Sequence, residues 1–158
     1  MDISLHQQSQ DAFFMKEALK EAVKAFEKGE IPIGALVVSP DGEIIGKGHN
    51  LVELSTCQLY HAEICALKEA CAHQSDWRLD NHTVYVTLEP CMMCISLCSL
   101  SRIERVVYGA ESPLFGFRLD KSRDSALYTK HIKNITGGVE AQGAAVLLKD
   151  FFSQIREN

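Results

Sequence analysis

No apolar run in this chain approaches the length of a membrane span. The longest runs, such as Ile31 to Val38, fall far below the roughly 18 residues that a spanning helix needs. Residues 1–10 contain neither a basic start nor an apolar stretch, so we expect no signal peptide. From these absences we expect a cytoplasmic protein without a membrane partner.

The chain also lacks internal repeats, low-complexity tracts and linkers. Its 158 residues suit one hydrophobic core, and we expect residues 1–158 to form a single domain. An overall basic excess is absent too, since the net charge is −5, which argues weakly against nucleic acid as a partner. The charge is uneven, however, because the stretch from Arg102 to Lys133 contains 7 basic and 4 acidic residues. Taken alone, this stretch is interpreted as a solvated surface.

The signs of a disulfide-stabilised secreted domain are missing as well. There are six cysteines, but without a secretory signal an even count gives little support for disulfide bonds. We expect reduced thiols, in the core or in loops, at Cys57, Cys65, Cys71 and Cys98.

Strands and helices are expected to alternate along most of the chain. Helical spacing of apolar residues predicts helices, and β-branched runs bounded by turn residues predict strands. We expect helices over 10–28, 61–72, 91–100 and 140–155, strands over 31–38, 43–48, 83–88, 105–108 and 134–139, a turn at 39–42 and a loop over 50–60. The inner side of the last helix is expected to carry Val146, Leu147, Phe151 and Ile155. This order favours an α/β fold with helices on both faces of a sheet.

Three potential zinc ligands and one additional carboxylate stand at two helix starts. His61 and Glu63 open one predicted helix, and Cys91 and Cys94 open another, with Pro90 at its first turn. Cys-x-x-Cys is a zinc-ligand spacing, although alone it could also be a redox pair or two core cysteines. His61 alone is more often an ordinary histidine, and Glu63 alone a surface charge. Together they predict one metal site, because helix starts in α/β folds lie beside the carboxyl ends of strands.

The count of ligands indicates catalysis. A structural zinc site fills four positions with protein groups, whereas a catalytic site leaves one position for water. His61, Cys91 and Cys94 fill three positions, and Glu63 is left to accept a proton from the water. A single carboxylate that passes one proton to a ring nitrogen and then to a leaving amine suits hydrolytic deamination.

These motifs resemble the zinc-dependent cytidine and deoxycytidylate deaminase superfamily, with its H-x-E and P-C-x-x-C signature. More narrowly, the chain resembles the bacterial tRNA-specific adenosine deaminases over most of its length. The matching segments are 30–35, 48–50, 61–67, 85–91, 101–103, 106–110 and 148–152. The resemblance implies a cytidine deaminase-like fold, a three-layer α/β/α sandwich around a mixed five-stranded sheet.

The resemblance also implies a function. In that family the wobble adenosine of a tRNA anticodon becomes inosine, with one zinc ion per subunit, a zinc-activated water as nucleophile and Glu63 as proton shuttle. Asn50 matches a family position that contacts the target base, although it could also be a turn residue. Phe151 and Phe152 match a pair near the RNA, although the helix period favours a core position for at least one of them. The basic stretch from Arg102 to Lys133 then becomes a candidate RNA-facing surface.

Family members are generally homodimers, so the resemblance implies a second subunit. An apolar helix face could supply the interface, or the same residues could be core. They are Met92, Met93, Ile95, Leu97 and Leu100.

Two loops depart from the family pattern, at residues 57–60 and 111–120. Both are expected near the mouth of the site, where they affect which flanking bases are recognised and leave the zinc chemistry unchanged. Two alternatives therefore stay open. One is a free nucleobase deaminase acting on guanine or cytosine. The other is a non-catalytic zinc-containing nucleic-acid-binding module, for which the unligated carboxylate of Glu63 is a poor fit.

Overall fold

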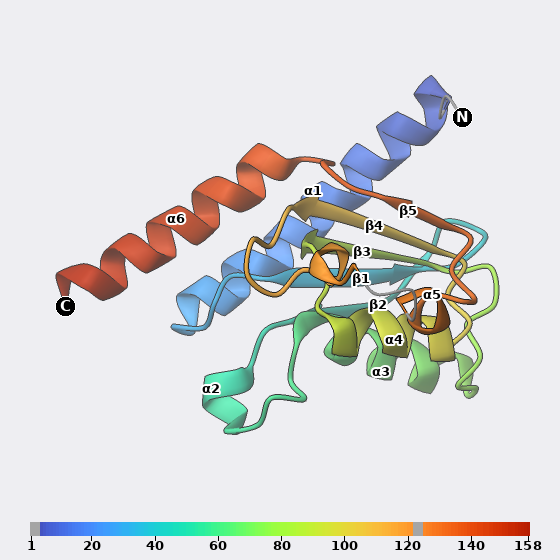
Figure 1. Cartoon of the computed structure of the whole chain (residues 1–158), viewed down its shortest axis with the longest axis horizontal. Coiled ribbons are helices and arrows are strands. Elements are labelled where there is room, and N and C mark those ends of the chain that lie inside the picture. Colours follow the sequence, from blue (N-terminus) through green and yellow to red (C-terminus); the bar gives the residue numbers. More distant parts are fainter. Residues whose placement is uncertain (1–3, 122–124) are drawn as a thin grey trace.

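A mixed five-stranded sheet, in the order β2-β1-β3-β4-β5, forms the centre of the computed structural model (Figure 1). The structure describes residues 4–121 and 125–158. The strands are β1 (Gly34–Val38), β2 (Ile44–His49), β3 (Thr83–Leu88), β4 (Arg105–Ala110) and β5 (Asn134–Thr136). Strand β1 pairs antiparallel with β2 and β3, whereas β4 pairs parallel with β3 and β5. The expected mixed five-stranded sheet is confirmed.

Helices cover both faces of this sheet. They are α1 (Leu5–Glu27), α2 (Val52–Ser55), α3 (Ala62–Gln74), α4 (Met92–Leu100), the 3-10 helix η1 (Phe117–Leu119), α5 (Ser125–Tyr128) and α6 (Ala141–Glu157). In Figure 1, α1 and α6 lie on one face, and α3 and α4 lie on the other. The three-layer α/β/α arrangement is therefore confirmed. Among the described residues, no helix has the length and apolar character needed to cross a bilayer.

The core has two parts, one on each face of the sheet. Strand β1 shows the division, because Ala35 and Val37 belong to the cluster beneath α3 and α4, whereas Leu36 and Val38 belong to the cluster beneath α1. Neighbouring side chains of a strand point to opposite faces. All five residues of β1 are consequently buried, which explains the continuous apolar run in the sequence.

A glycine lets α3 lie directly against strand β2. A Cβ atom at Gly48 would lie 2.3 Å from the carbonyl oxygen of Ala62, in the first turn of α3. No side chain fits at that distance. The close approach brings the start of α3 to the end of β2, and so sets the position of His61.

Hydrogen bonds at helix N-termini account for two differences from the predicted elements. Helix α1 begins at Leu5, earlier than predicted, because the Ser4 hydroxyl accepts a hydrogen bond from the N–H of Gln7 at 3.2 Å. The predicted loop over 50–60 contains α2, whose first N–H groups, those of Glu53 and Leu54, donate to the buried carboxylate of Glu30. Glu30 precedes α2 by more than twenty residues, so the local sequence did not indicate this cap.

The predicted inner side of α6 is only partly right. Phe151 is buried and contacts Phe26 of α1, with ring centroids 5.7 Å apart, and Leu147 is half-buried. Val146 and Ile155 are exposed, so their prediction as inner residues is wrong. Figure 1 shows the reason for Ile155, because the last turns of α6 extend beyond the sheet and have no strand to cover.

Candidate metal centre

Two helix starts present the candidate ligands. His61 and Cys91 occupy the cap positions of α3 and α4, both with extended backbone, and neither side chain hydrogen-bonds to its own helix end. Cys94 lies one turn into α4 and is buried. Side chains at the cap position often hydrogen-bond to the start of their helix. The side chains of His61 and Cys91 point instead toward a common centre.

The distances fit a zinc ion. The Nδ1 atom of His61 lies 3.5 Å from Sγ of Cys94 and 3.7 Å from Sγ of Cys91, and the three ligand atoms lie within 4.8 Å of one another. A tetrahedral zinc with Zn–S bonds of about 2.3 Å and Zn–N bonds of about 2.0–2.1 Å separates S from N by about 3.6 Å. The structure thus brings the three predicted ligands together at zinc spacing. Gln58, which the sequence did not indicate, orients the ring through a 3.2 Å contact between its Oε1 and Nε2 of His61.

The two sulfurs differ in acidity. A hydrogen bond from the Cys94 thiol lowers the pKa of Cys91 to about 4, and the same contact, together with burial, raises the pKa of Cys94. The hydrogen bond to Cys91 also raises the pKa of His61. A thiolate at Cys91 is therefore readily formed, and a dication would take the place of the proton on Cys94.

Glu63 is buried in the first turn of α3 and is not among the three clustered ligands. Burial raises the pKa of its carboxyl group, and the negative charge of Cys91 adds to that effect. The Cys94 thiol hydrogen-bonds to it and opposes the shift. This carboxyl group therefore lies beside the ligands and is suited to gain and lose a proton.

Asn50 lies at the same end of the fold as His61. Its N–H donates to the carbonyl of Ile33 at 3.0 Å, and the next residue, Leu51, donates to the carbonyl of Tyr60. The Asn50 residue is only 5% exposed, yet within the part of the chain that the structure describes its side chain has no hydrogen-bond partner. Among the described residues no buried side-chain polar atom lacks a partner, so the Asn50 amide reaches solvent.

A buried carboxylate anchors the loop that follows β4. Glu89 accepts hydrogen bonds from the N–H groups of Ser112 and Arg118, at 3.2 and 3.0 Å. The N–H of Phe117 donates to the carbonyl of Pro90 at 2.9 Å. The sequence did not indicate this role for Glu89, because its partners lie more than twenty residues away. The loop over residues 111–120, one of the two that depart from the family pattern, is thus held directly beside Cys91.

Much of the basic stretch from Arg102 to Lys133 is neutralised. Arg105 pairs with Asp11, Arg118 pairs with Glu89 and Glu111, and Lys133 pairs with Glu104. Arg123 and Asp124 lie outside the described residues. The positive charge that this stretch can offer to RNA is therefore smaller than its composition indicates.

The cysteines outside the proposed metal site agree with the expectation of reduced thiols. All six cysteines are free thiols, and Cys98 is buried in the core.

Helix α4 divides its apolar residues, since Ile95 is buried against the sheet, whereas Leu100 is 66% exposed and Met93 is also exposed. The apolar residues of α4, which the sequence assigned either to an interface or to the core, are therefore divided between the core and the outer surface.

Known proteins resemble the chain over most of its length. Residues 8–110 match the family of the cytidine and deoxycytidylate deaminase zinc-binding region. A tRNA-specific adenosine deaminase of Streptococcus pyogenes serotype M18 (strain MGAS8232) is 44% identical over 164 residues, covering 99% of this chain and 97% of the relative. A solved structure from a study of A-to-I editing by tRNA:A34 deaminases at the wobble position of transfer RNA is 36% identical, with a TM-score of 0.79, over 86% of this chain and 99% of that one. A guanine deaminase structure from Bacillus subtilis is 33% identical, with a TM-score of 0.61, over 71% of this chain and 78% of that one.

Proposed function

The chain belongs to the cytidine and deoxycytidylate deaminase zinc-binding family, and from this premise we propose that it converts adenosine to inosine at the wobble position of a tRNA anticodon. The observation that carries the chemistry is the set of three clustered ligands beside a buried carboxylate that is not one of them. The choice of tRNA is supported by a relative named for that substrate, which matches 99% of this chain. An anticodon loop is single-stranded, so its bases can enter a pocket at modest cost.

The ligand set proposed for one zinc ion per subunit is His61, Cys91 and Cys94. Two thiolates and one neutral imidazole are a normal donor set for zinc. Zinc bound there would act as a Lewis acid and make water a better nucleophile at neutral pH. Helix α4 supplies both sulfurs, of which that of Cys94 is buried and that of Cys91 belongs to a half-buried residue.

Glu63 is proposed as the proton shuttle. It takes a proton from the attacking water, delivers it to the ring nitrogen of adenine, and helps a second proton reach the departing amino group. Water and the adenine amine thereby become the inosine carbonyl and ammonia. The Asn50 amide, which can donate and accept, is proposed to hold the edge of the target base.

The wider setting of this activity is also part of the proposal. We expect the enzyme to work in the cytoplasm, where its tRNA substrate is found, and residues 1–158 to act as one domain. We propose a homodimer in which the outer side of α4 is covered, because Met93 and Leu100 are exposed apolar residues there.

Ammonia release from a synthetic anticodon stem-loop with adenosine at the wobble position tests the proposed substrate. The zinc-loaded protein should deaminate the stem-loop and leave free guanine, cytosine and adenosine essentially unchanged. Faster turnover of a free base than of the stem-loop would instead assign the protein to the free nucleobase deaminases.

Replacing Glu63 tests the proposed mechanism. Glu63→Gln keeps the size of the side chain but cannot carry the proton, so activity should fall by about 10²–10⁴-fold or more. Elemental analysis should find the zinc content unchanged, since Glu63 is not a proposed ligand. A variant that keeps its activity would remove Glu63 from the mechanism, and a variant that loses zinc would make it a ligand.

A further inference from the structure

The loop between β4 and η1 carries an aromatic ring that the fold does not use. Phe115 is 75% exposed, and among the described residues its ring contacts no other aromatic ring. The neighbouring aromatic residue, Phe117, instead packs on Tyr108 in an edge-on arrangement. One ring therefore holds the loop to the core, whereas the other faces outward.

The backbone of the loop keeps its shape without the Phe115 ring. The Ser112 hydroxyl accepts the N–H of Phe115 at 3.3 Å, and the Ser112 carbonyl accepts the N–H of Gly116 at 3.3 Å. Gly116 lies directly against Glu89, since a Cβ atom at this position would lie 2.4 Å from the Glu89 carboxylate. Every one of these contacts uses backbone, Ser112 or Glu89. The ring is thus presented by a rigid support and can be removed without releasing the loop.

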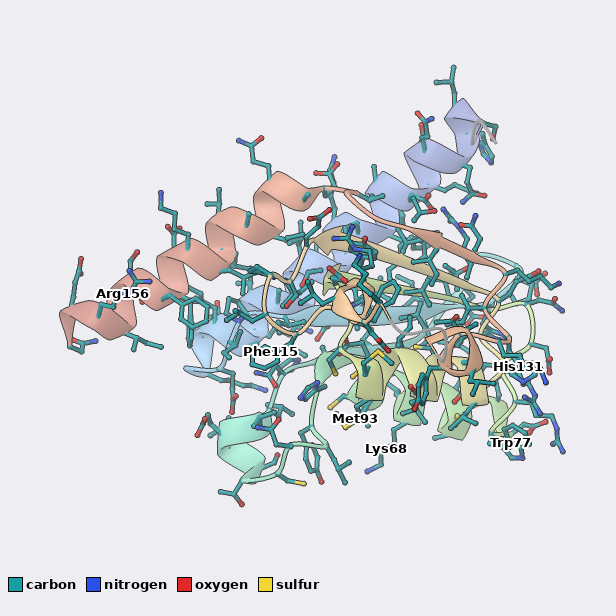
Figure 2. The ribbon with its side chains drawn as sticks, viewed as in Figure 1. Lys68, Trp77, Met93, Phe115, His131 and Arg156 are labelled. Atoms are coloured by element: carbon teal, nitrogen blue, oxygen red, sulfur yellow. The ribbon has the colours of Figure 1, made fainter. Side chains whose placement is uncertain are left out.

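This support places the ring beside the proposed zinc site. Phe117 is hydrogen-bonded through its N–H to Pro90, the residue just before the ligand Cys91. Phe115 lies two positions before Phe117, so the Cα atoms of the two residues are at most about 7 Å apart. Figure 2 shows Phe115 and Met93 on the side where helices α3 and α4 begin, whereas Trp77 and His131 lie toward the opposite side.

An exposed aromatic ring can stack on the base of a nucleotide next to the target. When the target adenosine leaves the stack to enter the pocket, its neighbour loses one stacking surface. Proteins that bind single strands commonly supply aromatic rings for the exposed face of a base. We propose that Phe115 stacks on the base of a nucleotide flanking the target adenosine and positions the substrate strand, an inference that rests on the proposed function.

Substitution at Phe115 tests the stacking contact. Phe115→Ala should lower kcat/KM for the stem-loop by about 5- to 150-fold, the range for loss of one base–aromatic stack. Phe115→Tyr keeps the ring and should restore most of that loss. Leu114→Ala is the matched control, because Leu114 lies on the same turn and is 76% exposed. It removes a comparable apolar side chain without a ring and should change kcat/KM less than about twofold.

Stem-loops with an abasic nucleotide on the 5′ or the 3′ side of the target identify the partner base. With wild-type protein, one of the two abasic substrates should lose about the same factor as Phe115→Ala loses with the intact stem-loop. With Phe115→Ala, that abasic substrate should cause little further loss, because the two changes remove the same contact. Independent effects at both positions would overturn the proposal.

Two further results would also overturn it. If Leu114→Ala loses as much as Phe115→Ala, the loop contributes apolar surface and not stacking. If sedimentation shows that Phe115→Ala weakens association between subunits, the ring belongs to a contact between copies of the chain. A wild-type protein inactive on every stem-loop would overturn the proposed function itself, whereas equal activity of wild type and Phe115→Ala would overturn the stacking role alone.

Discussion

Asn50 has an unusual position for a side-chain amide. Buried amides in proteins are normally hydrogen-bonded, because an unmet polar group costs about 1–3 kcal/mol. Asn50 is 5% exposed and, in the described ranges 4–121 and 125–158, only its backbone is hydrogen-bonded. Because no buried side-chain nitrogen or oxygen in those ranges lacks a partner, the unpaired Asn50 amide must lie where it reaches solvent. An amide that reaches solvent and has no protein partner is accessible to a ligand, which is consistent with the proposed contact to the target base.

Asn50→Ala should therefore reduce catalysis and leave the protein folded. Loss of the amide should lower kcat/KM for the stem-loop by about 10- to 100-fold, since one hydrogen-bonded contact to the base is removed. Stability should stay the same or rise slightly, because no protein partner is left unpaired. Thermal denaturation together with stem-loop kinetics checks this, and a large fall in Tm would make Asn50 a structural residue instead.

Single residues were predicted from sequence where their spacing is local. His61 and Glu63 share a helix turn, as do Cys91 and Cys94, so their types and spacings indicated the site directly. Glu89 could not be found this way, because the N–H groups that it accepts lie 23 and 29 residues further along the chain. Its role depends on how the loop folds back.

At the scale of elements, α4 joins two surfaces. Its start supplies two proposed zinc ligands, its inner side contributes Ile95 and Cys98 to the core, and its outer side leaves Leu100 exposed. Apolar side chains on an outer helix face are typical of an interface between subunits. The helix would then connect the proposed metal site to the interface of the proposed dimer.

Leu100→Asp should shift the protein toward monomers. A charge within an apolar interface must be desolvated, which weakens association, and Leu100 lies at the end of α4 away from the cysteines. Sedimentation velocity should show the shift while zinc content stays unchanged. Leu5→Asp, on the exposed side of α1, serves as control and should sediment like wild type. Identical behaviour of the two variants would place the interface elsewhere.

Helices and strands were predicted well where the apolar face given by the sequence pattern packs against another element. Helix α3 and strand β3 closely match their predicted ranges. Helix α2 was missed because its cap comes from Glu30, outside the segment. The pattern of α6 was correctly interpreted as a helix, but its apolar residues outnumber the positions that the sheet and α1 can cover.

For the molecule as a whole, one ion pair connects three elements. Asp11 of α1 receives two hydrogen bonds of 2.6 Å from Arg105 of β4 and one of 2.8 Å from the hydroxyl of Tyr85 on β3. Burial alone would raise the pKa of Asp11, but these donors outweigh it and hold the pKa below the usual 3.8. Burial and the hydrogen bond to Asp11 in turn raise the pKa of Tyr85.

Asp11→Asn should destabilise the fold near neutral pH and weaken its acid dependence. Removing one partner of a buried ion pair costs about 3–5 kcal/mol of unfolding free energy. Because the folded pKa of Asp11 is below the unfolded one, its stabilisation is complete above about pH 4 and is lost as pH falls through the folded pKa. Urea denaturation from pH 7 to pH 3 should show wild type and variant converging in acid. A constant difference across that range would mean that charge is not the cause.

The anchoring of the β4–η1 loop has a practical consequence for redesign. The fixed points of the loop are Ser112, Gly116 and Glu89, and none of their contacts uses the exposed side chain of Phe115. Exchange of the Phe115 side chain leaves every anchoring contact in place. Substitutions confined to this position should yield enzymes with altered preference for the nucleotides that flank the target and an unchanged reaction.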